Sequence, residues 1–190
     1  MTLIRTDVQA IVKNSPIEDT DIQEITLWSG NEKFNIYNFY CPSWSKTDIP
    51  LQQVSFKKTI VAGDFNAHLP QLGYSAYNKR GHNIEDIVNS SNLHLSQDSS
   101  STPTLFHRRH KTTHKPDLTL ISSDIYPSAE VTVLDGIGNS DHQPILITIT
   151  RGPEGKLKEP RKCHWNFKKA NWNLEQRLTQ NLRNSLQTGL

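Results

Sequence analysis

The sequence predicts an α/β (α+β) fold in which two β-sheets pack together as a sandwich flanked by helices, four layers in all. Two observations support this prediction. Short strand-like runs recur from residue 25 to residue 150, and only one stretch in this region has helical spacing. A chain of 190 residues is long enough for one domain with a sizeable core and an appendage.

Six runs of apolar and β-branched residues are expected to be strands: 25–30, 33–41, 58–63, 117–122, 129–134 and 144–150. The first two runs are separated by Gly30 and Asn31, a pair typical of a tight hairpin turn. Residues 33–41 carry apolar side chains at both odd and even positions. Such a strand is expected to be covered on both faces.

Helical spacing occurs at Ile84, Ile87 and Val88, with Asn83 as the expected N-cap. After residue 150 the composition changes to glycine, proline and charge, which is typical of a linker. Leucines then recur every fourth residue from 174 to 186, the pattern of an amphipathic helix. We therefore expect one domain over residues 1–150, followed by a basic linker and a helix over 151–190.

The overall composition excludes few classes of protein. The formal net charge is +2, and two cysteines make neither a disulfide framework nor a zinc site. Cys41 is expected to be a buried structural thiol. No apolar run approaches the ~20 residues of a membrane span, and the first residues lack the apolar core of a signal peptide. An intracellular protein with no membrane segment is expected.

One segment is strongly basic and rich in histidine. Arg108, Arg109 and Lys111 lie among three histidines in residues 107–114. Such a cluster suits the backbone of a nucleic acid, although an ordinary solvated loop is about as common. The histidines have a metal-like spacing, but no cysteine or acid nearby completes a zinc set.

Four polar clusters lie at the ends of predicted strands: Tyr40, Asp64 with Asn66, Asp117, and Ser140-Asp141-His142. Each alone has an ordinary explanation as a turn or a satisfied histidine. Together they meet the needs of phosphodiester hydrolysis: oxygen ligands for a divalent cation, a base for water, and donors to the phosphate. Asp117 could hold the imidazole of His142 in one tautomer.

The segments NFYCP (38–42), VAGDFNAH (61–68), KPDLTLIS (115–122) and NSDHQPI (139–145) occur in an order and at spacings that resemble the endonuclease/exonuclease/phosphatase superfamily. The likeness is greatest to the apurinic-type endonuclease domain of Jockey-type non-LTR (LINE-like) retrotransposons. NKRG (78–81), expected to open a helix, STPTLFH (101–107) and WNFKKANW (165–172) agree with it. The last segment resembles the connection from such an endonuclease to a reverse transcriptase.

The resemblance implies a role for each residue at the strand ends. Asp64 would be the general base that activates the attacking water, and Asn66 would orient that water or contact the phosphate. His142 would hydrogen-bond the scissile phosphate, with Asp117 orienting its ring. Tyr40 would contact the phosphate or assist the leaving oxygen. The product would be a nick with a free 3′-hydroxyl, which primes reverse transcription.

The resemblance also implies a cofactor and partners. Asp141 would take part in binding Mg²⁺ or Mn²⁺, and double-stranded target DNA would be the substrate. Element RNA and the reverse transcriptase of the full polyprotein would be further partners, with a nuclear site of action. The residues expected to contact nucleic acid are Arg108, Arg109, Lys111, Asn78 and Arg80.

Members of the superfamily begin with an Asn-bearing strand and a strand that ends in a metal-binding Glu, and neither matches this sequence. The resemblance therefore implies an N-terminally truncated domain that lacks its first strands and its principal Glu ligand. An alternative is a catalytically inactive remnant that at most binds nucleic acid. A third reading, a phosphatase or sphingomyelinase of the same superfamily, is disfavoured by the retroelement-like WNFKKANW segment.

Overall fold

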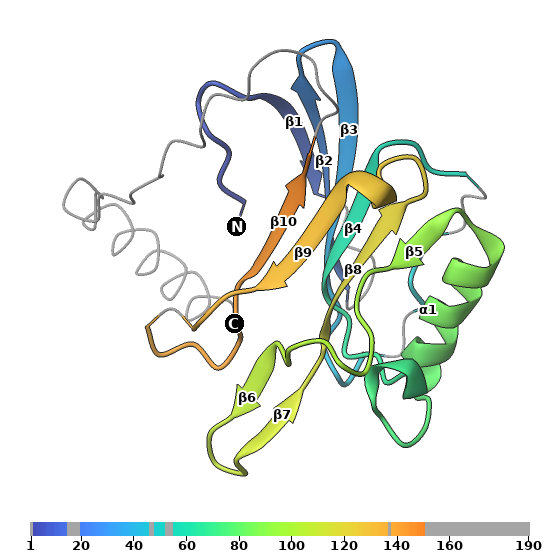
Figure 1. Cartoon of the computed structure of the whole chain (residues 1–190), viewed down its shortest axis with the longest axis vertical. Helices are drawn as coiled ribbons and strands as arrows, with labels where there is room; N and C mark the ends of the chain where they lie inside the picture. Colours follow the sequence, from blue (N-terminus) through green and yellow to red (C-terminus); the bar gives the residue numbers. More distant parts are fainter. Residues whose placement is uncertain (1, 15–19, 46–47, 52–54, 137, 151–190) are drawn as a thin grey trace, which may run out of the picture. The chain divides into compact units, whose positions relative to one another are not determined.

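Within the described residues the chain forms a series of strands with one α-helix between β4 and β5 (Figure 1). A computed structural model describes residues 2–14, 20–45, 48–51, 55–136 and 138–150. The elements are β1 (Gln9–Asn14), β2 (Asp21–Ser29), β3 (Glu32–Tyr40), β4 (Thr59–Asp64), α1 (Lys79–Ser90), β5 (Leu93–Leu95), β6 (Leu105–His107), β7 (Thr112–His114), β8 (Asp117–Ser122), β9 (Ala129–Val133) and β10 (Ile145–Ile149). Two single 3₁₀ turns, Pro70–Leu72 and Tyr126–Ser128, complete the described structure.

The largest sheet has six strands in the order β1-β2-β3-β4-β8-β5. Its strands pair antiparallel except for β3 and β4, which run parallel. A parallel pair needs a long connection, and here the chain passes through residues 41–58 between the two strands. Two further two-stranded sheets are formed by β9 with β10 and by β6 with β7.

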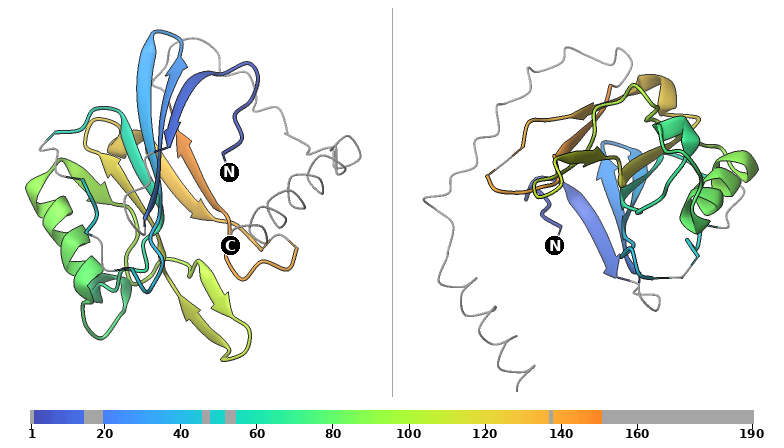
Figure 2. Two further views of the ribbon diagram at one scale, coloured as in Figure 1. Left: turned by 180° about the vertical axis from the view of Figure 1, so that it is seen from behind. Right: turned by 90° about the horizontal axis from the view of Figure 1, so that it is seen from below.

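The six-stranded sheet is covered on both faces, as the pattern of residues 33–41 predicts. Phe39 of β3 belongs to a core that includes Ile84 and Ile87 of α1. Phe34, from the same strand but the opposite face, belongs to a second core into which Val131 and Ile147 of the β9–β10 sheet pack. Figures 1 and 2 show α1 on one side of the sheet and β9–β10 on the other. The predicted sheet-rich α/β fold is confirmed.

Each of the six predicted strands is present. Strand β2 begins four residues before the predicted start at residue 25, and the other bounds differ by at most one residue. The strand predicted over 117–122 coincides with β8, and Gly30 with Asn31 forms the turn between β2 and β3. The predicted N-cap at Asn83 is wrong. Helix α1 starts five residues earlier, because the side chain of Asn78 accepts a hydrogen bond from the Gly81 amide and caps the first turn.

The linker and helix expected over 151–190 lie outside the described residues. Among the described residues, no helix is long and apolar enough to cross a membrane. Cys41 is buried, with 1% of its surface exposed, as expected for a structural thiol.

Candidate active site

The register of three strands brings Tyr40, Asp64 and Asp117 to one edge of the large sheet. Tyr40 and Asp64 are the last residues of the parallel strands β3 and β4, and they are register partners. Strand β8 runs antiparallel to β4, so its first residue, Asp117, is the partner of Asp64. Hydrogen-bond pairing of the backbone therefore sets three polar side chains in a row, on rigid elements.

Gly63 allows this row to form because its backbone conformation leaves no room for a side chain against its register partner Phe39. A Cβ atom at Gly63 would lie 2.0 Å from the carbonyl oxygen of Phe39. The residue also has a φ of +143°, which side chains other than hydrogen rarely tolerate. The glycine of the GDFN segment is thus required by the backbone that presents Asp64.

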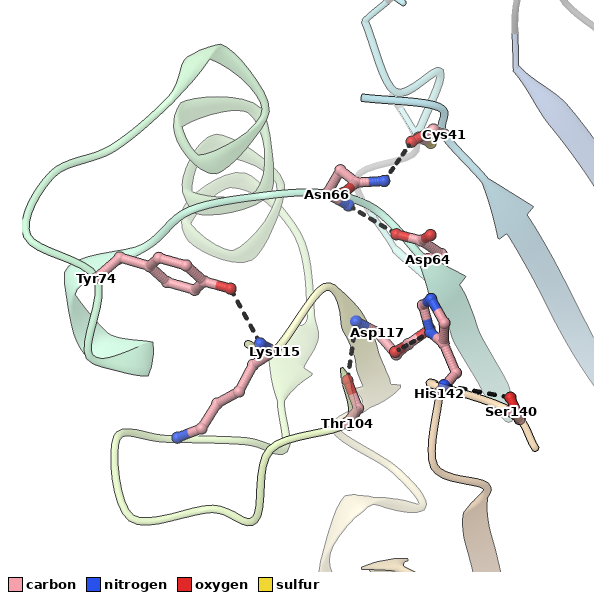
Figure 3. A network of polar contacts seen from close by, with 9 residues as sticks. All are labelled: Cys41, Asp64, Asn66, Tyr74, Thr104, Lys115, Asp117, Ser140 and His142. Carbon is pink, nitrogen blue, oxygen red and sulfur yellow. Dashed lines mark hydrogen bonds and ion pairs between the residues drawn. The ribbon is translucent and has the colours of Figure 1, made fainter. Parts of the chain in front are cut away.

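The structure brings His142 to this row from a distant part of the chain (Figure 3). Its Nδ1 atom lies 2.9 Å from Oδ2 of Asp117. The backbone amide of His142 donates to the hydroxyl of Ser140 over 3.2 Å, and a β-bridge joins His142 to Leu105. A carboxylate against Nδ1 leaves Nε2 as the ring atom free to face a substrate.

Asp64 is half-buried beside a second acid. Burial, and then the negative charge of Asp117, raise the pKa of the Asp64 carboxyl, while the backbone amide of Asn66 lowers it less strongly. That amide lies 3.1 Å from Oδ1 of Asp64. A carboxyl with a raised pKa is a stronger base than an ordinary aspartate and so is better suited to accept a proton.

Asn66 adopts a conformation that suits a functional loop. Its φ is +48°, in the left-handed region where asparagine is tolerated better than most residues. Its side-chain amide donates to the carbonyl oxygen of Cys41 over 3.0 Å. This bond ties the loop after β4 to the loop after β3.

Ligand atoms of Asp64, Asp117 and His142 lie within 4.8 Å of one another. Among the described residues, this is the one group of three such side chains close enough to share a metal ion. Two carboxylates fit a hard divalent cation, since Mg²⁺ is commonly held by one or two carboxylates and keeps several waters.

Asp141, expected as a metal ligand, is not in this group. It is exposed and lines a small pocket with His107, Arg108, Arg109 and Asn139. The sequence places it next to His142, but the two residues have different neighbours: His142 contacts Asp117, whereas Asp141 lines a pocket with basic residues of the β6–β7 hairpin.

The basic segment forms the exposed hairpin of β6 and β7, and it is attached to the loop that carries His142. The Phe106 amide donates to the Asp141 carbonyl over 2.8 Å, and the Gln143 amide donates to the Thr104 carbonyl over 2.7 Å. The guanidinium of Arg108 reaches the side chain of Asn139 and the carbonyl of Ser140 over 3.3 and 3.4 Å. Arg108, Arg109 and Lys111 are exposed, as contact with a nucleic acid requires.

Two residues expected to contact nucleic acid have other partners. Arg80 is 5% exposed, and its guanidinium donates to backbone carbonyls, so its expected contact with nucleic acid is wrong. Asn78 is engaged as the cap of α1: its Oδ1 accepts from the amides of Gly81 and His68, and its Nδ2 donates to the Asn66 carbonyl. Both residues lie at the N-terminus of α1, and their side chains hydrogen-bond the backbone of the neighbouring loops after β3 and β4.

Tyr74 and Lys115 extend the site in a way that the sequence does not indicate. The Tyr74 hydroxyl accepts a hydrogen bond from the Lys115 amide over 3.0 Å, two residues before Asp117. Burial raises the pKa of Tyr74, and the charges of Asp117 and Asp64 add to this effect. A lone tyrosine in a polar loop carries no local signal, so only the fold reveals its place near the two acids.

Comparison with known proteins places the chain in a family and a fold. Residues 34–146 match the model of a family described as endonuclease-reverse transcriptase. The structure is similar to the endonuclease domain of TRAS1, a telomere-specific non-LTR retrotransposon, with a TM-score of 0.59 and 17% identity over 75% of this chain and 67% of that one. At that identity the likeness shows the fold alone. Comparison by sequence with curated proteins gives no match.

Proposed function

The chain belongs to the endonuclease-reverse transcriptase family, and on that premise we propose that it is the metal-dependent DNA endonuclease domain of a non-LTR retrotransposon polyprotein. The observation that carries the proposal is the convergence of Asp64, Asp117 and His142 at one edge of the large sheet. These residues lie as many as 78 positions apart in the sequence. Polar residues that served only to form turns would not be expected to gather at one place in the fold.

The proposed reaction is hydrolysis of one phosphodiester bond. Asp64 takes a proton from water, and the water oxygen then bonds to phosphorus. The bond from phosphorus to the 3′-oxygen breaks and leaves a 5′-phosphate, and the 3′-oxygen takes a proton from solvent to become a 3′-hydroxyl. His142, held through Nδ1 by Asp117, donates from Nε2 in its protonated form to a phosphate oxygen as negative charge develops there. Tyr40, 51% exposed at the end of β3, lies at the same edge to contact the phosphate or the leaving oxygen.

The donor set at this edge fits Mg²⁺ or Mn²⁺, and the carboxylates of Asp64 and Asp117 would hold the ion. When bound, the cation would neutralise charge on the phosphate. Asp141 remains a proposed ligand that would have to reach the ion from outside this group. The 3′-hydroxyl would prime reverse transcription, which makes element RNA and reverse transcriptase the proposed partners and the nucleus the proposed site of action.

The exposed hairpin is the proposed contact with the backbone of double-stranded DNA. Arg109 and Lys111 present their charges to solvent, and Lys and Arg side chains neutralise phosphates without reading sequence. Because the hairpin is hydrogen-bonded to the loop of His142, DNA held by it would lie beside the candidate active site.

A nicking assay tests the proposal. The chain is incubated with supercoiled plasmid and Mg²⁺ or Mn²⁺, and we expect slow formation of relaxed circles whose nicks a DNA polymerase can extend. Chelation of the metal with EDTA and the variants Asp64→Asn and His142→Ala should each abolish this product. A protein that shifts DNA in a gel but never nicks it would instead be the inactive, nucleic-acid-binding remnant.

A further inference from the structure

Helix α1 begins with a charged side chain that points into the protein. Arg80 lies in the first turn of α1 and is 5% exposed. A buried charge is costly unless hydrogen bonds satisfy it. Among the described residues no carboxylate forms an ion pair with Arg80, although its charge helps to lower the pKa of Asp64. Its guanidinium instead donates to backbone carbonyl oxygens.

The guanidinium joins two loops. Nη1 donates to the carbonyl oxygens of Cys41 over 2.8 Å and Phe65 over 3.2 Å. Nη2 donates to the carbonyl oxygens of Pro42 over 2.6 Å and Ser45 over 2.8 Å. Three of these carbonyls belong to the loop after β3, and the fourth belongs to the loop after β4. The planar fork of arginine can serve both loops at once, whereas a lysine ammonium is a single point charge.

These two loops carry the proposed chemistry. Cys41 directly follows Tyr40, and Phe65 lies between Asp64 and Asn66. The Cys41 carbonyl accepts from Arg80 and from the side chain of Asn66, so the guanidinium and the Asn66 amide share one acceptor. A displacement of Arg80 would therefore move the Cys41 carbonyl and release Asn66.

We propose that Arg80 is a positioning residue of the active site, whose buried guanidinium sets the placement of Tyr40, Asp64 and Asn66 relative to one another. This inference rests on the proposed function and adds to it a residue that touches neither DNA nor metal. Loss of Arg80 should lower the rate of nicking at saturating DNA and leave DNA binding unchanged. A misplacement near 1 Å can cost about 100-fold in rate.

The test compares Arg80→Lys with Arg5→Lys in the full chain. Arg5 is exposed and lies outside the candidate site, so its variant is the matched control. We expect Arg80→Lys to lower kcat by roughly 10- to 100-fold with KM for plasmid changed by less than about two-fold. Arg5→Lys should keep both constants. A rise in KM with kcat unchanged would show a direct DNA contact and overturn the proposal.

A second readout does not depend on activity. In ¹H–¹⁵N spectra the Asn66 side-chain amide should shift and exchange faster in Arg80→Lys, while backbone signals of Val131 and Ile147 stay in place. Unchanged Asn66 signals would overturn the proposal even if the parent chain nicks DNA. A parent chain that does not nick would refute the proposed function, and the Asn66 signals would still decide the role of Arg80.

If Arg80→Lys fails to fold, the same measurements are made on Arg80→Gln. That variant keeps one amide donor group and removes the buried charge. The signals of β9 and β10 report the fold in the same sample. If both variants lose those signals, Arg80 supports the whole domain and the proposal is wrong. Retained β9–β10 signals with altered Asn66 signals are the expected result.

Discussion

The Nδ1 atom of His142 and the Oδ2 atom of Asp117 lie 2.9 Å apart, although 25 residues separate them in sequence. We expect Asp117→Asn to lower kcat for nicking by about 10²- to 10⁴-fold, because an amide cannot hold the ring in the same tautomer or stabilise its charged form. KM for plasmid should stay nearly constant. Steady-state nicking measures both constants, and a full rate in Asp117→Asn would show that the pair is only structural.

The carboxyl of Asp64 should titrate above its usual pKa when no metal is bound. Burial and the charge of Asp117 raise the pKa of Asp64 from its usual value of 3.8. The ¹³Cγ signal of Asp64, followed across acidic pH in the presence of EDTA, should therefore have a midpoint above 3.8. The variant Asp117→Asn should lower that midpoint, because it removes the neighbouring negative charge. A midpoint at or below 3.8 in the parent chain would contradict the assignment.

The same carboxyl should cost stability at neutral pH. Because the folded-state pKa of Asp64 is above its unfolded value, the folded protein binds more protons between the two values. The free energy of unfolding contributed by this group therefore falls as pH rises through that window, and stays low above it. Asp64→Asn should raise the Tm at pH 7, with a smaller gain or none at pH 3. Thermal melts at both pH values check the sign, and a lower Tm at pH 7 would contradict it.

The hairpin charges should act through DNA phosphates. Lys111 has a φ of +52°, so Lys111→Gly removes the charge without straining the turn. The slope of log K against log salt concentration should fall by about 0.9 for each lost phosphate contact, uniformly across DNA sequences. Fluorescence titrations at several salt concentrations measure it. Lys33→Ala is the control, because Lys33 lies at the opposite end of β3 from Tyr40. Equal slopes in Lys111→Gly and the parent chain would exclude the contact.

Local pattern was enough to predict four strands of the large sheet, β2, β3, β4 and β8, but not its edge strands β1 and β5. The apolar run of β8 has five buried residues out of six, and its bounds follow from that run alone. The strands β6 and β7 were not predicted, because they are three residues long and mostly exposed, and so show no alternation. Their pairing depends on the contact with the loop of Asp141, which lies more than 25 positions away.

The sequence predicted the acids and the histidine of the candidate site, but not the residue that holds their loops in place. Asp64, Asp117 and His142 carry chemistry that residue type alone suggests, and their strand-end positions bring them together. Arg80 was misassigned because an arginine at a polar helix start is ordinarily a surface charge. Arg80 is buried because it donates to carbonyl oxygens of residues 15 to 39 positions earlier in the chain. The local sequence around Arg80 does not show that the fold brings these carbonyls close to it.

Gly81 provides the sharpest test of how α1 supports the site. Replacing glycine by alanine inside a helix normally stabilises the helix by up to about 1 kcal/mol. Here a Cβ atom would lie 1.9 Å from the carbonyl oxygen of His68, in the loop that follows Asn66. We therefore expect Gly81→Ala to lower the free energy of unfolding by roughly 1–3 kcal/mol, the usual cost of overpacking.

Urea denaturation measures that change, with Asn89→Ala as the control on an exposed position of the same helix. Asn89→Ala should be neutral or slightly stabilising, because only helix propensity changes there. Amide exchange should accelerate at residues 65–68 in Gly81→Ala and stay slow in β9 and β10, since the clash lies between α1 and that loop alone. A stabilised Gly81→Ala would mean that helix propensity outweighs the clash, and that α1 does not pack against the His68 carbonyl as closely as described.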